Sequence, residues 1–430
     1  MKDIRRELAT RKYKTTSPFI YWAYHKLAKL VYRKCNMHFE IIDDVNDCDG
    51  PCVVIFNHLS RLDHIYVMLA TYPKRINMLA GYNEFFRSHL HTVFKLNNVL
   101  PKKNYCNDIT GMKAMMSIIK QGGSITFAPE GLASNDGTNK PIVPGTGHLL
   151  KKLNVPVYFC ELRGQYLQNT KHCLDERHGK TCAKLSLLFS TEELKELSSV
   201  EIDDKINNSF RHDEYAWQKE QHVKWESYGR ICHRLEDVLY RCPRCGKEFE
   251  MYGHENVIEC KACGNGATVD DYYDFHKFND DCVIPDLFTD WITEERMAII
   301  REIRNDPDFS FKENVKIGIL PNDRYLKKLK TSVIVSEGVF TVDHDGVHYR
   351  GKNDDSHDFD LTYNEIYTVI TEVDSSFFNF YVKGEYHDVF PERKSSIKIS
   401  MLIEEMHRLH VNTYKNFVWN DFMYEPEKNK

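Results

Sequence analysis

The chain has 430 residues, of which 42% are hydrophobic and 28% are charged, and its formal net charge is −5. The length predicts about two to four domains with packed cores, and the mildly acidic balance argues against a protein that binds nucleic acid through bulk positive charge. Thirteen cysteines, an odd and mostly scattered set, favour a reducing cytosol over a secreted disulfide framework. The first residues lack a secretory signal pattern, and no apolar run approaches the roughly 18 residues of a membrane-spanning helix.

Positive charge is concentrated in the first 34 residues, which contain ten Lys or Arg and two acidic residues. Within a basic region over residues 1–36, the segment 17–34 predicts a helix that begins at Ser17-Pro18. An apolar stripe beside basic and aromatic side chains is typical of a helix in a membrane interface, and a helix packed on its own domain shows the same pattern. The predicted stripe consists of Ile20, Tyr24, Leu27 and Val31.

Short apolar strands alternate with helical segments after residue 37. This alternation indicates an α/β domain over residues 37–239, with a mostly parallel sheet flanked by helices. Ligands bind such sheets at the carboxyl ends of the strands, where we expect His58 and the segment Pro129-Glu130-Gly131. The pattern predicts strands near 38–42, 52–56, 76–80, 124–127 and 155–158, and helices near 65–70, 108–120 and 143–153.

A histidine followed five residues later by an aspartate is a candidate pair of general base and orienting carboxylate. The spacing alone does not select one pair, because it occurs three times, at His58/Asp63, His38/Asp43 and His276/Asp281. Only the first pair stands at the end of a predicted buried strand.

Three sequence blocks occur in a fixed order around this pair: NHLSRLD at 57–63, FAPEG at 127–131 and NVPV at 154–157. Together they resemble the blocks of the glycerophospholipid acyltransferases, typified by 1-acylglycerol-3-phosphate acyltransferase. The resemblance covers about residues 50–165. It separates His58 from the other two histidines, which lack the downstream blocks.

The resemblance implies an enzyme of phospholipid biosynthesis that transfers a fatty acyl group from acyl-CoA or acyl-carrier protein to a hydroxyl of a lysophospholipid, first of all 1-acylglycerol-3-phosphate. In this reaction His58 removes the proton of the hydroxyl, and Asp63 orients the imidazole and stabilises its charged form. No redox cofactor is implied. The resemblance further places Glu130 and Gly131 in an acceptor-binding loop. It implies that Asn57 and Ser60 shape the turn around His58.

Two departures from the family pattern concern the acceptor. Leu132-Ala133-Ser134 stands where the family usually has Thr-Arg-Ser, and Lys102 and Lys103 are the nearest match to the arginine of the second block. A lysine can bind a phosphate as a point charge but not as a bidentate fork. Two alternatives therefore stay open: an acyltransferase for a non-glycerophosphate lipid, and a non-catalytic lipid-binding scaffold.

A four-cysteine pattern follows over residues 240–270. Two Cys-x2-Cys pairs are separated by fourteen residues, the spacing of a zinc ribbon. A segment of about 30 residues does not build a sufficient core without a metal or disulfides, and disulfides fit a reducing compartment poorly. We therefore predict a structural zinc ion bound by Cys242, Cys245, Cys260 and Cys263.

The last part of the chain predicts a helical linker over residues 271–310 and a β-rich domain over 311–425. A strong hairpin signal occurs at Asp345-Gly346, and a helix is predicted over 397–410. Several antiparallel strands closed by a helix resemble a pleckstrin-homology-like (PH-like) or GRAM-like domain, which binds lipid headgroups or proteins, or dimerises. The whole pattern favours a peripheral protein on the cytoplasmic face of a membrane, with no nucleic-acid partner.

Overall fold

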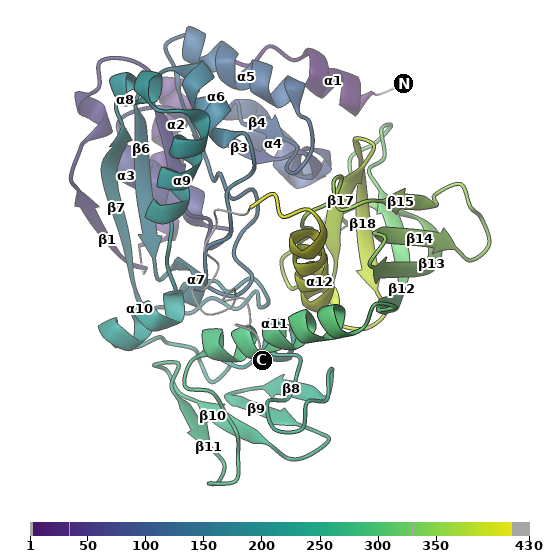
Figure 1. Ribbon diagram of the computed structural model, residues 1–430. Coiled ribbons are helices and arrows are strands. Elements are labelled where there is room, and N and C mark those ends of the chain that lie inside the picture. The colour runs from purple at the N-terminus through teal and green to yellow at the C-terminus, as the bar shows by residue number, and fades with distance from the viewer. Residues whose placement is uncertain (1–2, 34, 328–329, 415–430) are drawn as a thin grey trace.

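The structure is a computed structural model that describes residues 3–33, 35–327 and 330–414, and within these residues the strands form three sheets (Figure 1). Lys2 and Lys34 of the predicted basic region, and residues 415–425 of the predicted last domain, lie outside the described residues.

The first sheet has seven strands in the order β1-β7-β6-β2-β5-β3-β4. All of its neighbouring strands run parallel except β6 and β7, which are antiparallel. The sheet is therefore mixed, close to the mostly parallel sheet that the sequence predicts. Its strands are β1 (Asn36–Ile41), β2 (Val53–Phe56), β3 (Ile76–Gly81), β4 (Leu100–Lys102), β5 (Ser124–Phe127), β6 (Val157–Arg163) and β7 (Lys180–Phe189).

Strand β2 lies inside this sheet and is buried on both faces, because successive side chains point to opposite sides. Val53 and Ile55 pack in one hydrophobic core, and Val54 and Phe56 pack in another. Helices cover both faces (Figure 1). The helices of this part of the chain are α1 (Ile4–Thr10), α2 (Pro18–Val31), α3 (Asp63–Thr71), α4 (Ser88–Leu96), α5 (Ile109–Lys120), α6 (Thr146–Leu153), α7 (Gln165–Gln168), α8 (Thr191–Glu196), α9 (Ser199–Ser209) and α10 (Glu214–Gln221), with short 3-10 turns η1 (Val45–Asp47), η2 (Tyr82–Phe86) and η3 (Leu235–Asp237).

Helix α2 buries a different face from the predicted stripe. Tyr21, His25 and Ala28 are buried, whereas Leu27 and Val31 are 55% and 59% exposed. The contacting face depends on where α3 lies, which the pattern of α2 alone does not contain. Among the described residues, no helix has both the length and the apolar character that crossing a membrane requires.

The second sheet contains the four-cysteine segment. Its four strands are antiparallel in the order β11-β10-β9-β8. Strands β8 and β9 form an antiparallel hairpin between the two cysteine pairs. The strands are β8 (Met251–His254), β9 (Val257–Cys260), β10 (Gly266–Val269) and β11 (Phe275–Lys277).

The third sheet has seven antiparallel strands in the order β15-β14-β13-β12-β18-β17-β16. The predicted turn at Asp345-Gly346 joins β13 to β14. The elements are α11 (Phe288–Asn305), β12 (Ser310–Ile319), β13 (Val333–Asp343), β14 (Val347–Gly351), β15 (Phe359–Leu361), β16 (Ile370–Thr371), β17 (Phe378–Val382), β18 (Glu385–Pro391) and α12 (Ser396–His410).

The three sheets share one continuous hydrophobic core. The cluster that contains Val54 of the first sheet also contains Ile258 of the second and Phe340 of the third. Figure 1 shows α12 between the first and third sheets, and α11 running above the second sheet. The C-terminal part of the chain is thus packed against the α/β domain, and α12 is placed to contact its loops.

Candidate active site

His58 and Asp63 form a close pair at the carboxyl end of β2. His58 Nδ1 lies 2.8 Å from Asp63 Oδ2, so the carboxylate accepts the Nδ1 proton and leaves Nε2 as the basic nitrogen. The Asp63 carboxylate is buried and also accepts the backbone N–H groups of Leu59 and Ser60, at 2.7 and 2.9 Å. Asp63 is the first residue of α3, where the helix dipole stabilises a negative charge.

Asn57 and Ser60 hold the turn between β2 and α3. The Ser60 hydroxyl donates to Asp63 Oδ1 at 2.8 Å and accepts the N–H of Leu62 at 3.1 Å. The Asn57 amide bonds both backbone groups of Leu162 on β6, at 2.7 and 3.0 Å. Both side chains are buried, so they fix the turn that carries His58.

Glu130 lies beside His58 but directs its carboxylate towards the backbone. Oε1 accepts the N–H of His58 and Oε2 accepts the N–H of Lys140, each at 2.8 Å. Complete burial raises the pKa of Glu130 to about 8, against the effect of these two hydrogen bonds. This geometry favours a role in holding the protein backbone over the direct contact with an acceptor that the resemblance implies.

A cavity of about 410 Å³ opens beside His58, at the carboxyl ends of β2, β3 and β5. Its lining combines apolar and polar side chains, which suits a ligand with a hydrocarbon chain and a polar head. The polar part of the lining includes His58, Lys102, Asn104 and Asp108, and Gly131 also lines the cavity. The apolar part of the lining includes Leu79, Met112, Met115, Phe127, Val143 and Leu149.

The side chains of the two lysines predicted to bind phosphate lie in different places. Lys102 lines the cavity, where its ammonium lies 3.8 Å from Asp108 and burial lowers its pKa. Lys103 points to the third sheet: its ammonium donates to the carbonyl of Gly384 at 3.2 Å and lies 4.8 Å from the ring centre of Tyr82. The structure therefore brings Lys102, but not Lys103, together with His58.

The other two histidines of the repeated spacing have different partners. His38 contacts Asn36 on its own strand, at 2.9 Å. His276 is exposed and contacts Asp270 at 2.8 Å, in place of Asp281. Of the three pairs, the His58/Asp63 pair is the one whose two side chains meet at a strand end.

Sequence reasoning missed a buried charged network next to Glu130. Lys140 is buried and lies 3.1 Å from Asp136 and 4.0 Å from Glu404 of α12. Arg296 of α11 bonds Glu404 at 2.8 Å. Residues 134–140, SNDGTNK, look like an exposed polar turn, and no local signal predicts that α12 covers it.

The four cysteines predicted to bind metal come together. Every pair of their sulfur atoms lies within 4.8 Å, and the short contacts are 3.7 Å between Cys242 and Cys263 and 3.8 Å between Cys245 and Cys260. Four thiols at this separation fit a tetrahedral ion such as zinc. Gly246 and Gly264 follow the pairs with positive φ angles of 72° each, as each tight turn requires.

A His–Asp pair at a strand end, beside a half-apolar cavity in a mixed α/β sheet, is an arrangement that acyl transfer can use. Residues 36–162 match the family model described as Acyltransferase. Residues 36–162, which contain His58, Asp63 and Glu130, therefore form a domain of the acyltransferase type.

Two known proteins to which the chain is similar carry acyltransferase names. The chain is 28% identical over 148 residues to the chloroplastic 1-acyl-sn-glycerol-3-phosphate acyltransferase BAT2 of Brassica napus, which covers 33% of this chain and 42% of the relative. It thus spans about two fifths of that relative's length. The 1-acyl-sn-glycerophosphate (LPA) acyltransferase PlsC of Thermotoga maritima is 16% identical, with a TM-score of 0.39, over 45% of this chain and 77% of that one.

Proposed function

We propose that the protein transfers a fatty acyl group from a thioester, acyl-CoA or acyl-carrier protein, to a hydroxyl of a lysophospholipid in phospholipid biosynthesis. The single observation that carries this proposal is the His58–Asp63 pair, which is held at 2.8 Å beside the cavity. The acceptor named for both relatives, 1-acylglycerol-3-phosphate, is the first acceptor to test.

In the proposed mechanism, His58 Nε2 removes the proton of the acceptor hydroxyl as its oxygen attacks the thioester carbonyl. The carbon–oxygen bond forms and the carbon–sulfur bond breaks, and the imidazolium then gives its proton to the departing thiolate. Asp63 keeps the Nδ1 proton in place and stabilises the imidazolium. No covalent bond between the protein and the acyl group is needed.

The cavity suits the two ends of a lysophospholipid. The apolar part of its lining, with Leu79, Met112 and Met115, can take hydrocarbon. Lys102 supplies a positive charge to the polar part, and a lysine binds phosphate as a point charge. Lys102 is therefore the residue that we propose for the acceptor phosphate.

Mass spectrometry of products tests this function and its alternatives. Purified protein is incubated with acyl-CoA and a panel of 1-acylglycerol-3-phosphate, other lysophospholipids and neutral lipid acceptors. The proposal expects a diacyl product from 1-acylglycerol-3-phosphate. A product from neutral acceptors alone would favour the non-glycerophosphate alternative, and no product from any pair would favour a lipid-binding scaffold.

We also propose that the protein binds the cytoplasmic face of a membrane peripherally, through α2. Phe19, Trp22 and Leu30 are 69%, 46% and 61% exposed on this helix, next to the exposed Lys26 and Lys29. Exposed aromatic and aliphatic side chains among lysines suit the boundary between headgroups and acyl chains. An acyltransferase for lysophospholipids would find its acceptor there.

We further propose that Cys242, Cys245, Cys260 and Cys263 bind a structural zinc ion. When bound, zinc would cross-link the two cysteine turns of the second sheet. The PH-like identity of residues 311–425 and the domain boundaries given above are likewise proposals, supported by the antiparallel third sheet and the helix α12 that follows it.

A further inference from the structure

The loop that follows Glu130 holds the backbone of His58 on two sides. Glu130 Oε1 accepts the His58 N–H at 2.8 Å, and the N–H of Ser134 donates to the His58 carbonyl at 2.7 Å. The second Glu130 oxygen accepts the N–H of Lys140 at 2.8 Å. The position of the imidazole therefore depends on the position of the loop over residues 130–140.

The C-terminal part of the chain holds this same loop directly. The hydroxyl of Thr371, on β16, bonds the side-chain oxygen of Asn135 at 2.5 Å. The ammonium of Lys140 lies 4.0 Å from the carboxylate of Glu404, on α12. All four side chains are buried, so these contacts form inside the protein.

Lys171 makes a third connection between this loop and the C-terminal part of the chain. Its ammonium donates to the carbonyl of Ala133 at 2.9 Å, and its own carbonyl accepts the N–H of Asp374 at 2.7 Å. The loop is thus held at residues 133, 135 and 140 by groups that depend on the third sheet and α12.

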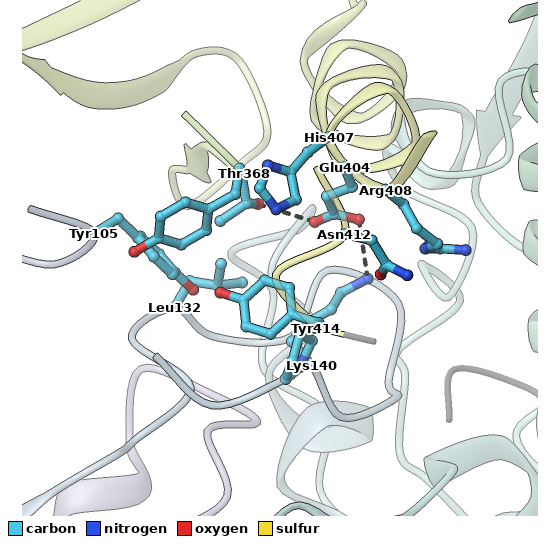
Figure 2. Close-up of a pocket in the computed structure, with 11 residues that line it drawn as sticks. Tyr105, Leu132, Lys140, Thr368, Glu404, His407, Arg408, Asn412 and Tyr414 are labelled. Atoms are coloured by element: carbon cyan, nitrogen blue, oxygen red, sulfur yellow. Dashed lines mark hydrogen bonds and ion pairs between the residues drawn. The ribbon is translucent and has the colours of Figure 1, made fainter. Parts of the chain in front are cut away.

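Glu404 is the central charged group of this contact. Figure 2 shows its carboxylate between the hydroxyl of Thr368, at 2.9 Å, and the ammonium of Lys140. Arg296 bonds the same carboxylate at 2.8 Å. Burial opposes the charge of Glu404, but Lys140 and Arg296 lower its pKa below the usual value, so the carboxylate is ionised.

Removing the charge of Glu404 leaves Lys140 with Asp136, at 3.1 Å, and Arg296 with Glu405, at 2.8 Å, so the two buried cations are less fully compensated and we expect them to shift. Lys140 would be affected directly, and its backbone N–H is one of the two groups that hold Glu130. A shift of the Glu130 loop displaces the His58 backbone, and displacing a catalytic group by about 1 Å can cost on the order of a hundredfold in rate.

We propose that Glu404 is a positioning residue for acyl transfer: through Lys140 it keeps the Glu130–Ser134 loop in place around His58, which makes α12 part of the catalytic unit. This inference rests on the proposed function, because it takes His58 as the base. It adds that the α/β domain depends for its activity on a helix that lies beyond it in the chain, Ser396–His410.

The test compares Glu404→Gln with Lys398→Met in the full chain. Lys398 is a matched control because it is equally buried on the same helix and pairs with Glu248, in the four-cysteine segment. A second variant, Thr371→Val, removes the bond to Asn135 without changing a charge. For each protein, kcat and KM for acyl transfer, the Tm, and the hydrogen-exchange rates of the His58, Ser134 and Lys140 amides are measured.

We expect Glu404→Gln to lower kcat about tenfold with KM changed by less than about twofold, and to speed exchange at the three amides. Thr371→Val should also lower kcat and speed exchange, to a smaller extent. Lys398→Met should keep kcat within about twofold of wild type, even if its Tm falls as much as the Tm of Glu404→Gln. Wild-type kcat and unchanged exchange in both Glu404→Gln and Thr371→Val would overturn the proposal, as would an equal loss of kcat in Lys398→Met.

The exchange measurement separates this proposal from the proposed function. If the wild-type protein transfers no acyl group, the proposed function is wrong. The hydrogen-exchange rates of the amides then test the positioning role of Glu404 by themselves. Faster exchange at His58 and Lys140 in Glu404→Gln, but not in Lys398→Met, would then support it, and equal exchange in the two variants would overturn it.

Discussion

The carboxylate of Glu130 accepts the backbone N–H of His58 at 2.8 Å, and 72 residues separate the two in the sequence. A residue that the family resemblance places in the acceptor-binding loop therefore fixes the backbone of the candidate base. Both carboxylate oxygens are occupied by backbone N–H groups, of His58 and Lys140.

Glu130→Gln should weaken these two hydrogen bonds, because one of the two backbone N–H groups would face an amide nitrogen that cannot accept it. An unsatisfied buried donor costs about 1–3 kcal/mol. We expect a loss of folding stability of this order and a lower kcat, with KM for the acceptor nearly unchanged. Chemical denaturation and steady-state kinetics check both. A variant that raises KM and keeps kcat would show that Glu130 contacts the acceptor instead.

The raised pKa of Glu130 predicts a pH dependence of stability. Its pKa is about 8 in the folded protein, against 4.5 as the ordinary value, because burial disfavours the charged form. The stability that this protonation contributes is complete below pH 4.5 and is lost as the pH rises through 8. The stability difference between wild type and Glu130→Gln should therefore shrink between pH 5 and pH 8. A difference that stays constant over this range contradicts the assignment.

Lys102 and Lys103 allow a matched test of the proposed contact with the acceptor phosphate. Lys102 lines the cavity with His58, whereas Lys103 contacts Gly384 and the ring of Tyr82. Lys102→Met should raise KM for 1-acylglycerol-3-phosphate about tenfold, the loss of one charge-assisted contact of about 1.5 kcal/mol. Lys103→Met should leave that KM within about twofold. A larger effect of Lys103→Met would place the phosphate outside this cavity.

The exposed face of α2 predicts binding to anionic vesicles. Trp22→Ser should weaken sedimentation with vesicles that contain anionic phospholipid by about tenfold, since burying a large apolar side chain is worth about 1.5–3 kcal/mol. Val339→Ser is the control, because Val339 is 37% exposed on the third sheet. Binding should also weaken at high salt if Lys26 and Lys29 contribute. Equal loss in the two variants would argue against α2 as the membrane contact.

The four-cysteine cluster predicts about one zinc ion per chain in protein purified under reducing conditions. Cys245→Ser or a strong chelator should remove the zinc and lower the Tm, because structural zinc contributes folding free energy. Cys282→Ser is the control, since Cys282 lies outside the cluster. Metal analysis that finds no zinc in the wild-type protein would contradict the ribbon assignment.

The features that the sequence predicts well are local ones. Residues 53–63 contain a buried strand, a turn and the first residue of a helix, and each has a signal within a few residues. The pairing of Cys242 and Cys245 with Cys260 and Cys263 is encoded in their spacing in the same way. Asp108 also caps α5 as its position suggests, accepting the N–H of Gly111 at 2.9 Å.

The features that the sequence does not predict depend on distant partners. The direction of Lys103 is set by Gly384, 281 residues away, and the burial of Lys140 is set by Glu404. The buried face of α2 is chosen by the position of α3, so the apolar pattern of α2 alone selects Leu27 and Val31 wrongly. Such choices follow from packing between segments, about which a single sequence contains no local signal.

Asp63→Asn tests the orienting role. The amide would present a nitrogen to donors that the carboxylate now accepts, from Leu59 and Ser60, and it would no longer fix the Nδ1 proton of His58. We expect kcat to fall by about 10²–10⁴. Activity near the wild-type level in a folded Asp63→Asn protein would remove Asp63 from the mechanism.

The most direct test of the central claim is the rate of diacyl product formation by wild type and His58→Ala, measured by mass spectrometry with acyl-CoA and 1-acylglycerol-3-phosphate. We expect product from wild type and a rate lower by about 10³ or more in His58→Ala, with the Tm of the variant close to that of wild type. Product formation by His58→Ala at the wild-type rate would contradict this claim.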